Sequence, residues 1–351
     1  MRTLTLAVAL SCVARPAAAQ DPHPTFKVGT ATATRGQTAT GAIKVPPGAD
    51  AGYDIPVAVV HGAKPGPVLA VVAGSHGSEY ASIIAVEALI TAVKSADLSG
   101  TLILVPIVNI ASFEKIVPHV NPTDNKSMNR FYPGAPNGTQ TDRASYAMTK
   151  EVVEQCDHLI DLHGGDLDEN LRPYSYWTVT GNQRQDDVSK AMVLAFGLDH
   201  IIISADRPKD PNASRYLENT ASTRGKPSFT AEAGRSGPVD QGDVALLVKG
   251  VQNVLGHLKM TATRPTPVAR PVWIERIVNL AAEQDGVFHA LVDRGAHVTK
   301  GMKIGAVTDY LNRPIKDIVA PEDGVITFIR ALPSLRKGDT IANIGVIKKG
   351  A

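Results

Sequence analysis

The chain has 351 residues, of which 43% are hydrophobic and 20% charged, and its 36 Lys and Arg against 34 Asp and Glu give a formal charge of +2. This composition is typical of a globular protein, and it excludes disordered, collagen-like and low-complexity sequence as the dominant state. The near balance of charge gives no electrostatic basis for binding nucleic acid, and no basic run of the kind that binds membrane surfaces is present.

The first segment, residues 1–19, has the layout of a secretory signal peptide. Arg2 precedes an apolar run over residues 4–13, and small residues follow at 17–19. The run is shorter than the roughly 20 apolar residues that a membrane span needs. We therefore expect an exported protein, periplasmic or secreted, with no membrane span; the alternative is a disordered N-terminal extension. Removal of the segment leaves Cys156 as the only cysteine, which excludes an internal disulfide.

Strand and helix patterns then alternate along the chain. Alternating Thr, Val and Ala between Gly breaks predict short strands within residues 21–55. Continuous apolar runs predict buried strands at 67–74, 102–108, 158–162, 201–203 and 228–231. Helical patterning predicts helices at 80–95, 142–156, 188–196, 213–224 and 240–258. This alternation predicts an α/β fold with a doubly wound sheet that helices cover on both faces.

The pattern changes after residue 260. Residues 261–272 contain three Pro in twelve positions and predict a linker. Beyond it, residues 273–351 show short runs with period-two alternation between Gly and Asp, which predict β-hairpins and no helix. We therefore expect an α/β domain at 20–260 and a small all-β domain at the C-terminus.

Histidine and carboxylate side chains follow two of the buried strands. His76 and Glu79 stand three residues apart, and in a first helical turn this spacing places both side chains on one face. His163 follows the strand at 158–162, and sites in α/β sheets gather at the carboxyl ends of strands. Two imidazoles and a carboxylate suit zinc and leave one position open for water, as in catalytic sites. We expect one zinc ion per chain on these residues; the alternative is that the histidines belong to the core.

Two further segments carry candidate site residues. Glu232 follows the buried strand at 228–231, where its carboxylate could take a proton from water activated by the metal; the alternative is a salt-bridged Glu at a strand end. Asn129 and Arg130 lie in a loop rich in Pro, Gly and Asn. The planar fork of Arg matches a carboxylate, so this pair is a candidate substrate contact, and the alternative is a solvated loop.

Taken together, these segments resemble the succinylglutamate desuccinylase/aspartoacylase family of zinc hydrolases, relatives of the zinc carboxypeptidases. The resemblance lies in GSHGSE at 74–79, DNKSMNRFYPG at 124–134, DLHGG at 161–165 and TAEAG at 230–234, and the C-terminal hairpins are also similar to those of the family. It implies a zinc-carboxypeptidase-like mixed sheet with a small C-terminal β domain. It also implies zinc on His76, Glu79 and His163, Glu232 as general base, and Asn129 with Arg130 as the clamp on a substrate carboxylate.

The chain departs from the family pattern at one catalytic position. The family has an Arg roughly ten residues before the Asn-Arg pair, where it polarises the scissile carbonyl. Between residues 101 and 129 this chain has no Arg. His119 is the nearest basic group and the candidate catalytic replacement, with Lys115 and Lys126 as alternatives; otherwise His119 is a plain loop residue.

Residues after DLHGG supply weaker candidates for substrate binding. Tyr174 and Tyr176 stand in RPYSYW, where they either line the pocket or pack as strand aromatics. Arg172 is a candidate second contact for a substrate carboxylate, and Arg207 and Arg235 are less favoured ones.

The resemblance implies an amide hydrolase that releases the acyl group from a small N-acyl amino acid. A carboxypeptidase or a peptide or cell-wall amidase is the alternative that the leader favours, since an exported enzyme meets short peptides. A non-catalytic periplasmic binding protein is the alternative from another class. No nucleic-acid partner is expected, and the sequence allows an oligomer.

Overall fold

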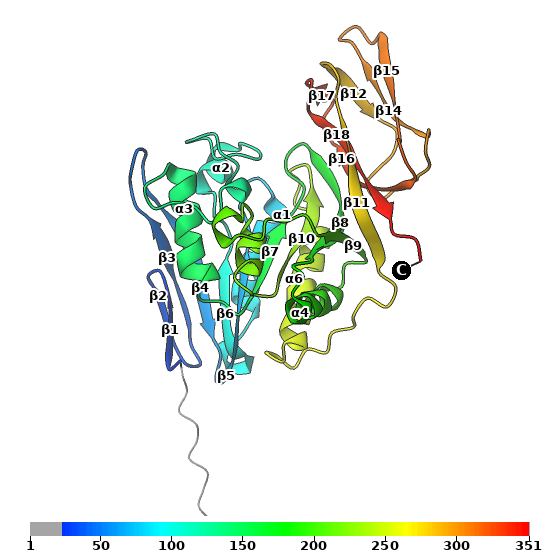
Figure 1. Ribbon diagram of the computed structural model, residues 1–351. Helices are drawn as coiled ribbons and strands as arrows, with labels where there is room; N and C mark the ends of the chain where they lie inside the picture. The colour runs from blue at the N-terminus through cyan, green and yellow to red at the C-terminus, as the bar shows by residue number, and fades with distance from the viewer. Residues whose placement is uncertain (1–22, 351) are drawn as a thin grey trace, which may run out of the picture.

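The computed structural model describes residues 23–350 (Figure 1). The predicted leader at 1–19 lies outside these residues, and export stays a prediction. Within the described part, no helix combines the length and apolar character that crossing a membrane requires.

A 12-stranded mixed sheet runs through the molecule, in the order β13-β16-β18-β11-β9-β8-β10-β7-β5-β6-β4-β3. Its strands up to residue 235, together with the separate β1–β2 hairpin, are β1 (Thr25–Val28), β2 (Ala31–Thr34), β3 (Thr38–Val45), β4 (Tyr53–His61), β5 (Lys64–Val72), β6 (Ser99–Val105), β7 (His158–His163), β8 (Glu169–Thr178), β9 (His200–Ser204) and β10 (Ser228–Arg235). The centre, β6-β5-β7-β10, is parallel. Antiparallel strands flank it on both sides, β4 beside β6 and β8 beside β10.

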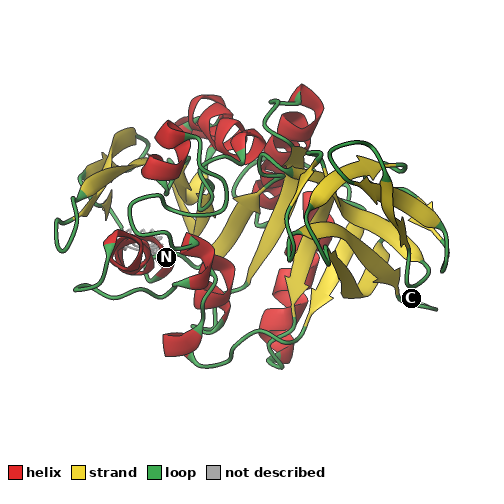
Figure 2. Ribbon diagram, turned by 90° about the horizontal axis from the view of Figure 1, so that it is seen from above, coloured by secondary structure: helices red, strands yellow, loops and turns green. Residues whose placement is uncertain are grey.

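Helices cover both faces of this sheet (Figure 2). They are α1 (Tyr80–Ala92), α2 (Ile110–Lys115), α3 (Gln140–Met148), α4 (Gln183–Phe196), α5 (Leu217–Ser222) and α6 (Gln241–His257). Successive side chains of a strand point to opposite faces. In β5, Leu69 and Val71 pack into the core under α1, α4 and α6, whereas Ala70 and Val72 pack into the core with α3 and α5. This two-sided burial explains why β5 reads as a continuous apolar run.

The mixed α/β class is confirmed, and most predicted elements are present with shifted ends. The helix expected at 188–196 begins at Gln183, because the Asn182 side chain accepts a hydrogen bond from Gln185 N and caps it. The helix expected at 142–156 ends as an α-helix at Met148 and continues as a π-helical turn over Thr149–Val153. The sequence reading missed strand β8 and helix α2.

Residues 272–347 contain strands only: β11 (Val272–Ala281), β12 (Gly286–Ala290), β13 (His297–Val298), β14 (Lys303–Thr308), β15 (Pro314–Val319), β16 (Gly324–Arg330), β17 (Ser334–Leu335) and β18 (Thr340–Ile347). They enclose an apolar core of their own around Phe288, Ile304 and Ile344. They also extend the large sheet, because β11 pairs with β9 and β16 pairs with β8. The predicted boundaries at 260 and 273 stay predictions, and the sheet is continuous across them.

Candidate active site

Two of the predicted metal ligands lie in the turn between β5 and α1. The turn starts at Gly74, whose φ is +68° and where a Cβ atom would come within 2.8 Å of Ile107 Cα. Glu79 is the N-cap of α1 and not part of its first turn, so the predicted placement of this pair inside the helix is wrong. The turn nevertheless brings His76 Nδ1 to 2.6 Å from Glu79 Oε1.

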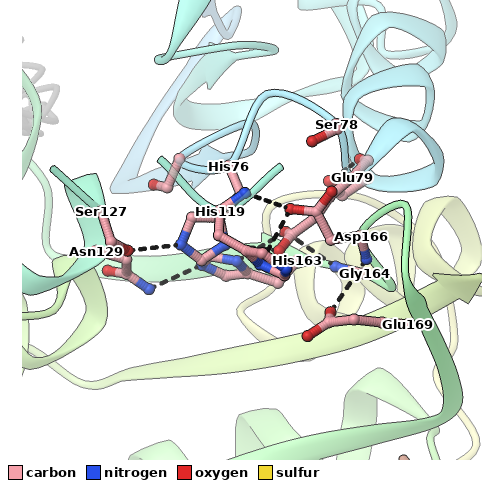
Figure 3. Close-up of polar contacts among 12 residues, drawn as sticks. His76, Ser78, Glu79, His119, Ser127, Asn129, His163, Gly164, Asp166 and Glu169 are labelled. Carbon is pink, nitrogen blue, oxygen red and sulfur yellow. Dashed lines mark hydrogen bonds and ion pairs between the residues drawn. The ribbon is translucent and has the colours of Figure 1, made fainter. Parts of the chain in front are cut away.

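The third predicted ligand, His163, ends β7, the parallel neighbour of β5. Its Nδ1 lies 2.8 Å from Glu79 Oε2, and Gly164 N donates a hydrogen bond of 3.1 Å to the same oxygen (Figure 3). One ligand atom from each of His76, Glu79 and His163 lies within 4.8 Å of the other two. The carboxyl ends of β5 and β7 therefore bring together residues that are 84 positions apart in the chain.

The surroundings of His163 fit a metal ligand. Its second ring nitrogen, Nε2, lies 3.2 Å from Asp161 Oδ1. Asp161 is fully buried, and within residues 23–350 this contact with His163 is the one ion pair that its carboxylate forms. A carboxylate behind the imidazole is the usual means of orienting a zinc-bound histidine. Two imidazole nitrogens and a carboxylate oxygen, converging in this way, fit a zinc ion.

Glu232 lies on β10, in register with His163 of β7 and Tyr174 of β8. Burial is the main cause that raises the pKa of Glu232 above its usual range; His163 opposes the shift, and Glu79 and other carboxylates add to it. A carboxyl group with a raised pKa holds a proton more readily than an ordinary Glu, which suits a group that must take up a proton and return it.

The metal cluster opens into a cavity of about 550 Å³, and the predicted catalytic, metal-binding and substrate-binding residues line it with two exceptions, Arg172 and Arg235. Arg235 pairs with Asp240 at 3.1 Å. Arg172 instead donates to both carboxylate oxygens of Asp199 at 2.9 Å. The β8–β10 register shifts between Glu232 and Gly234, so that Leu171 and Tyr174 both face the cavity. This bulge turns Arg172 away, and the structure does not bring it to the site.

Asn129 and Arg130 lie in a 3-10 turn at the cavity wall. Asn129 Nδ2 is 3.1 Å from His163 Nε2, and its Oδ1 accepts a hydrogen bond from Leu217 N at the start of α5. The amide thus contacts a metal ligand. The Arg130 guanidinium stacks 4.8 Å from the centre of the Tyr216 ring, and Arg207 stacks on the same ring at 3.9 Å. Two guanidinium groups therefore face the cavity.

His119 also lines the cavity, with its ring centre 6.4 Å from that of His76. Its Nε2 lies 2.8 Å from Asp168 Oδ1 and its Nδ1 3.3 Å from Asp166 Oδ2. Burial alone would lower the pKa of His119, but the bond to Asp168 and the charge of Asp166 outweigh it and raise the pKa to about 9. Lys115 and Lys126, the alternatives to His119, do not line the cavity. Lys126 Nζ instead lies 2.6 Å from Asp142 Oδ2.

The sequence reading missed several residues of the cavity wall. Glu169 begins β8, and Tyr216 precedes α5. Phe328 of β16 and Asn343 of β18 come from the C-terminal strands. No spacing rule connects residues so far apart in the chain. Glu169 alone carried a signal, because it stands six positions after a candidate ligand in an acidic segment.

These features define a mixed α/β protein with a His/Glu/His cluster at the carboxyl ends of its central strands. Residues 65–258 match the model of the succinylglutamate desuccinylase/aspartoacylase catalytic domain, and the chain belongs to this family. The resemblance expected from the sequence is confirmed.

Individual relatives span nearly the whole chain. The N-alpha-acetyl-L-2,4-diaminobutyric acid deacetylase of Halomonas elongata is 26% identical over 299 residues, which cover 84% of this chain and 86% of the relative. The structure of a succinylglutamate desuccinylase from a Silicibacter species is similar with a TM-score of 0.80 and 23% identity, covering 91% of this chain and 98% of that one. The product-bound ectoine utilization protein EutE of Ruegeria pomeroyi is similar with a TM-score of 0.80 and 23% identity, covering 92% and 99%.

Proposed function

We propose that the protein is a zinc-dependent hydrolase that removes the acyl group from a small N-acyl amino acid. The observation that carries the proposal is the convergence of His76, Glu79 and His163 beside the buried carboxyl of Glu232, in one cavity. The family supports it, and the deacetylase of Halomonas elongata acts, by its name, on an N-acetyl amino acid.

Zinc bound to the three ligands would supply a Lewis acid that lowers the pKa of water and polarises the amide carbonyl. Glu232 takes the proton of the attacking water on its carboxylate and returns it to the amine nitrogen as the C–N bond breaks. Arg130 and Arg207 hold the substrate carboxylate by charge-assisted hydrogen bonds. Phe328 of β16 contributes an apolar side chain to the cavity wall.

His119 supplies positive charge near the scissile carbonyl, in the place of the missing Arg. Its Nε2–H is already donated to Asp168, so the contribution is the charge of the ring and not a hydrogen bond to substrate. Asp168 is held in turn by Arg330 of β16, whose Nη1 is 3.1 Å from Asp168 Oδ2. Preorganised charge of this kind stabilises the oxygen anion that develops in the transition state.

The charge of His119 predicts a pH dependence. The folded protein holds its proton up to a pKa of about 9, above the ordinary value of 6.5. The positive charge is therefore present at neutral pH, and kcat/KM should fall as the pH rises through about 9. Profiles of wild type and Asp168→Asn measure this, and loss of the Asp168 carboxylate should move the alkaline limb toward 6.5. If the alkaline limb of the pH profile does not move in Asp168→Asn, then a group other than His119 causes the loss of activity at high pH.

A mixed-substrate assay tests the proposed function. The purified protein, supplied with zinc, is incubated with N-acetyl, N-succinyl and N-aroyl amino acids and with short peptides, and mass spectrometry identifies the products. We expect chelator-sensitive release of free amino acid from one acyl class. Cleavage of peptides alone would support a carboxypeptidase or a peptide or cell-wall amidase instead. If the protein binds zinc but turns over none of these substrates, the result would contradict an enzyme of either kind.

A further inference from the structure

The carboxylate of Glu169 is a rigid feature of the cavity wall that the proposed mechanism does not use. Its backbone N donates to Asp166 O at 3.0 Å, and its carbonyl accepts from Ser236 N at 2.8 Å. Arg330 of β16 pairs with it in register on the other side. Its side-chain Oε2 accepts a hydrogen bond of 3.1 Å from Asp166 N. The carboxylate is therefore held in one place before any ligand binds.

No cation within residues 23–350 forms an ion pair with Glu169, and the cations nearby are already engaged. His119 lies between Asp166 and Asp168. Arg330 bridges Asp168 at 3.1 Å and a second carboxylate, Asp339, at 3.0 Å. Carboxylates therefore outnumber cations on this side of the cavity. A partly buried carboxylate without a cation is costly unless a ligand supplies one.

The pKa of the Glu169 carboxyl group is raised, as expected for a partly buried carboxylate that no cation in the described part of the chain pairs with. Burial raises the pKa of Glu169 to about 7, and the charge of Glu79 adds to the rise, although His119 opposes it. A bound ammonium group would lower the pKa again, because an opposite charge nearby favours the ionised form.

The two charged walls of the cavity lie on opposite sides of the metal cluster. Figure 3 shows Asn129 and Glu169 on either side of His163. Arg130 Nη1 donates a hydrogen bond of 2.6 Å to Asn129 O, and the guanidinium groups of Arg130 and Arg207 stack on the same Tyr216 ring, so both groups lie on the Asn129 side. A substrate whose carboxylate binds the guanidinium groups and whose amide lies over the metal cluster would extend its acyl group toward Glu169.

We propose that Glu169 binds an ammonium group of the substrate, and that the preferred substrates are aminoacyl amino acids, with a free amine in the acyl part, over plain acyl amino acids. This inference rests on the proposed function and narrows its substrate class. An ammonium donates charge-assisted hydrogen bonds to a carboxylate, and these are about twice as strong as neutral ones. The fixed position of Glu169 means that little ordering of the protein opposes binding.

The test compares substrates that differ only by the amine. In the first pair, a β-alanyl amino acid is compared with the butyryl derivative of the same amino acid. In the second pair, Nα-acetyl-ornithine is compared with Nα-acetyl-norvaline, which moves the amine to the leaving amino acid. We expect wild type to favour the β-alanyl substrate in kcat/KM by roughly 10- to 100-fold, as a hydrogen bond to a charged group would give.

Glu169→Gln should remove most of this selectivity, and Glu169→Asp should keep part of it. Calorimetric binding of the products β-alanine and butyrate gives a second readout that needs no turnover, and Glu169→Gln should lose the preference for β-alanine. Glu322→Gln, a change at an exposed carboxylate of the C-terminal strands, is the matched control. Zinc content and thermal unfolding of each variant check that it folds.

A selectivity ratio that is equal in wild type and Glu169→Gln overturns the proposal, and so does a wild type without preference in either pair. Preference for the amine in the second pair alone, lost in Glu169→Gln, supports an ammonium site but overturns its placement on the acyl side. Failure to hydrolyse any of the four substrates overturns the ammonium-site proposal if the same preparation hydrolyses another N-acyl amino acid in the mixed-substrate assay. Failure in both assays contradicts the proposed deacylase itself.

Discussion

Glu232→Gln is expected to keep one zinc ion per chain and to lose about 10²–10⁴-fold in kcat. The amide of Gln has nearly the shape of the carboxyl group but cannot accept the proton of the attacking water. Glu232 is not among the three clustered metal ligands, so zinc content should not change. Steady-state kinetics and metal analysis of the same preparation measure the two quantities.

The control for this variant is again Glu322→Gln, which removes an exposed carboxylate of the C-terminal strands. It should match wild type in kcat and in zinc content. Activity of Glu232→Gln within tenfold of wild type would mean that another group accepts the proton. Glu169, whose pKa is raised to about 7 in the same cavity, would then be the first residue to test.

His163→Ala is expected to abolish tight zinc binding. The change removes one of three protein ligands and leaves the buried Asp161 without the imidazole it faces. Loss of a group that merely orients a ligand costs roughly 10–100-fold in metal affinity, and loss of the ligand itself should cost more. Zinc content after dialysis against a weak chelator measures the effect.

His289→Ala, at an exposed histidine of β12, should retain zinc like wild type. Circular dichroism and thermal unfolding of both variants separate loss of metal from loss of fold. One equivalent of zinc in dialysed His163→Ala would remove this residue from the ligand set.

The sequence predicts the central strands well, because each is a continuous apolar run that the fold buries on both faces. Leu69 to Val72 in β5 show this pattern, with alternate side chains in two different cores. Strand β8 escaped prediction because Pro173 and several polar residues interrupt its apolar positions. It is held by its neighbours, pairing with β10, β9 and β16.

Some residues of the candidate site could likewise be predicted from the sequence, and others could not. His76, Glu79, His163 and Glu232 could be proposed because each comes directly after a buried strand that the sequence predicts, and parallel strands end at one edge of a sheet. The sequence analysis favoured Arg172 over Arg207 as a substrate contact, and the structure reverses this order. A register shift in β8 turns Arg172 to Asp199, whereas stacking on Tyr216 brings Arg207 to the cavity.

By itself, then, the sequence determined the α/β class, the strand ends that carry the metal cluster and the family, because these depend on local patterns and short motifs. Only the tertiary structure decided which charges face one another in the cavity. The Asp168–His119 contact joins residues 49 positions apart, and the contact of Arg330 with Asp168 depends on β16 pairing with β8, across more than 150 residues of chain. Pairings between strands so far apart in the chain depend on how the whole sheet packs, so local sequence patterns cannot predict them.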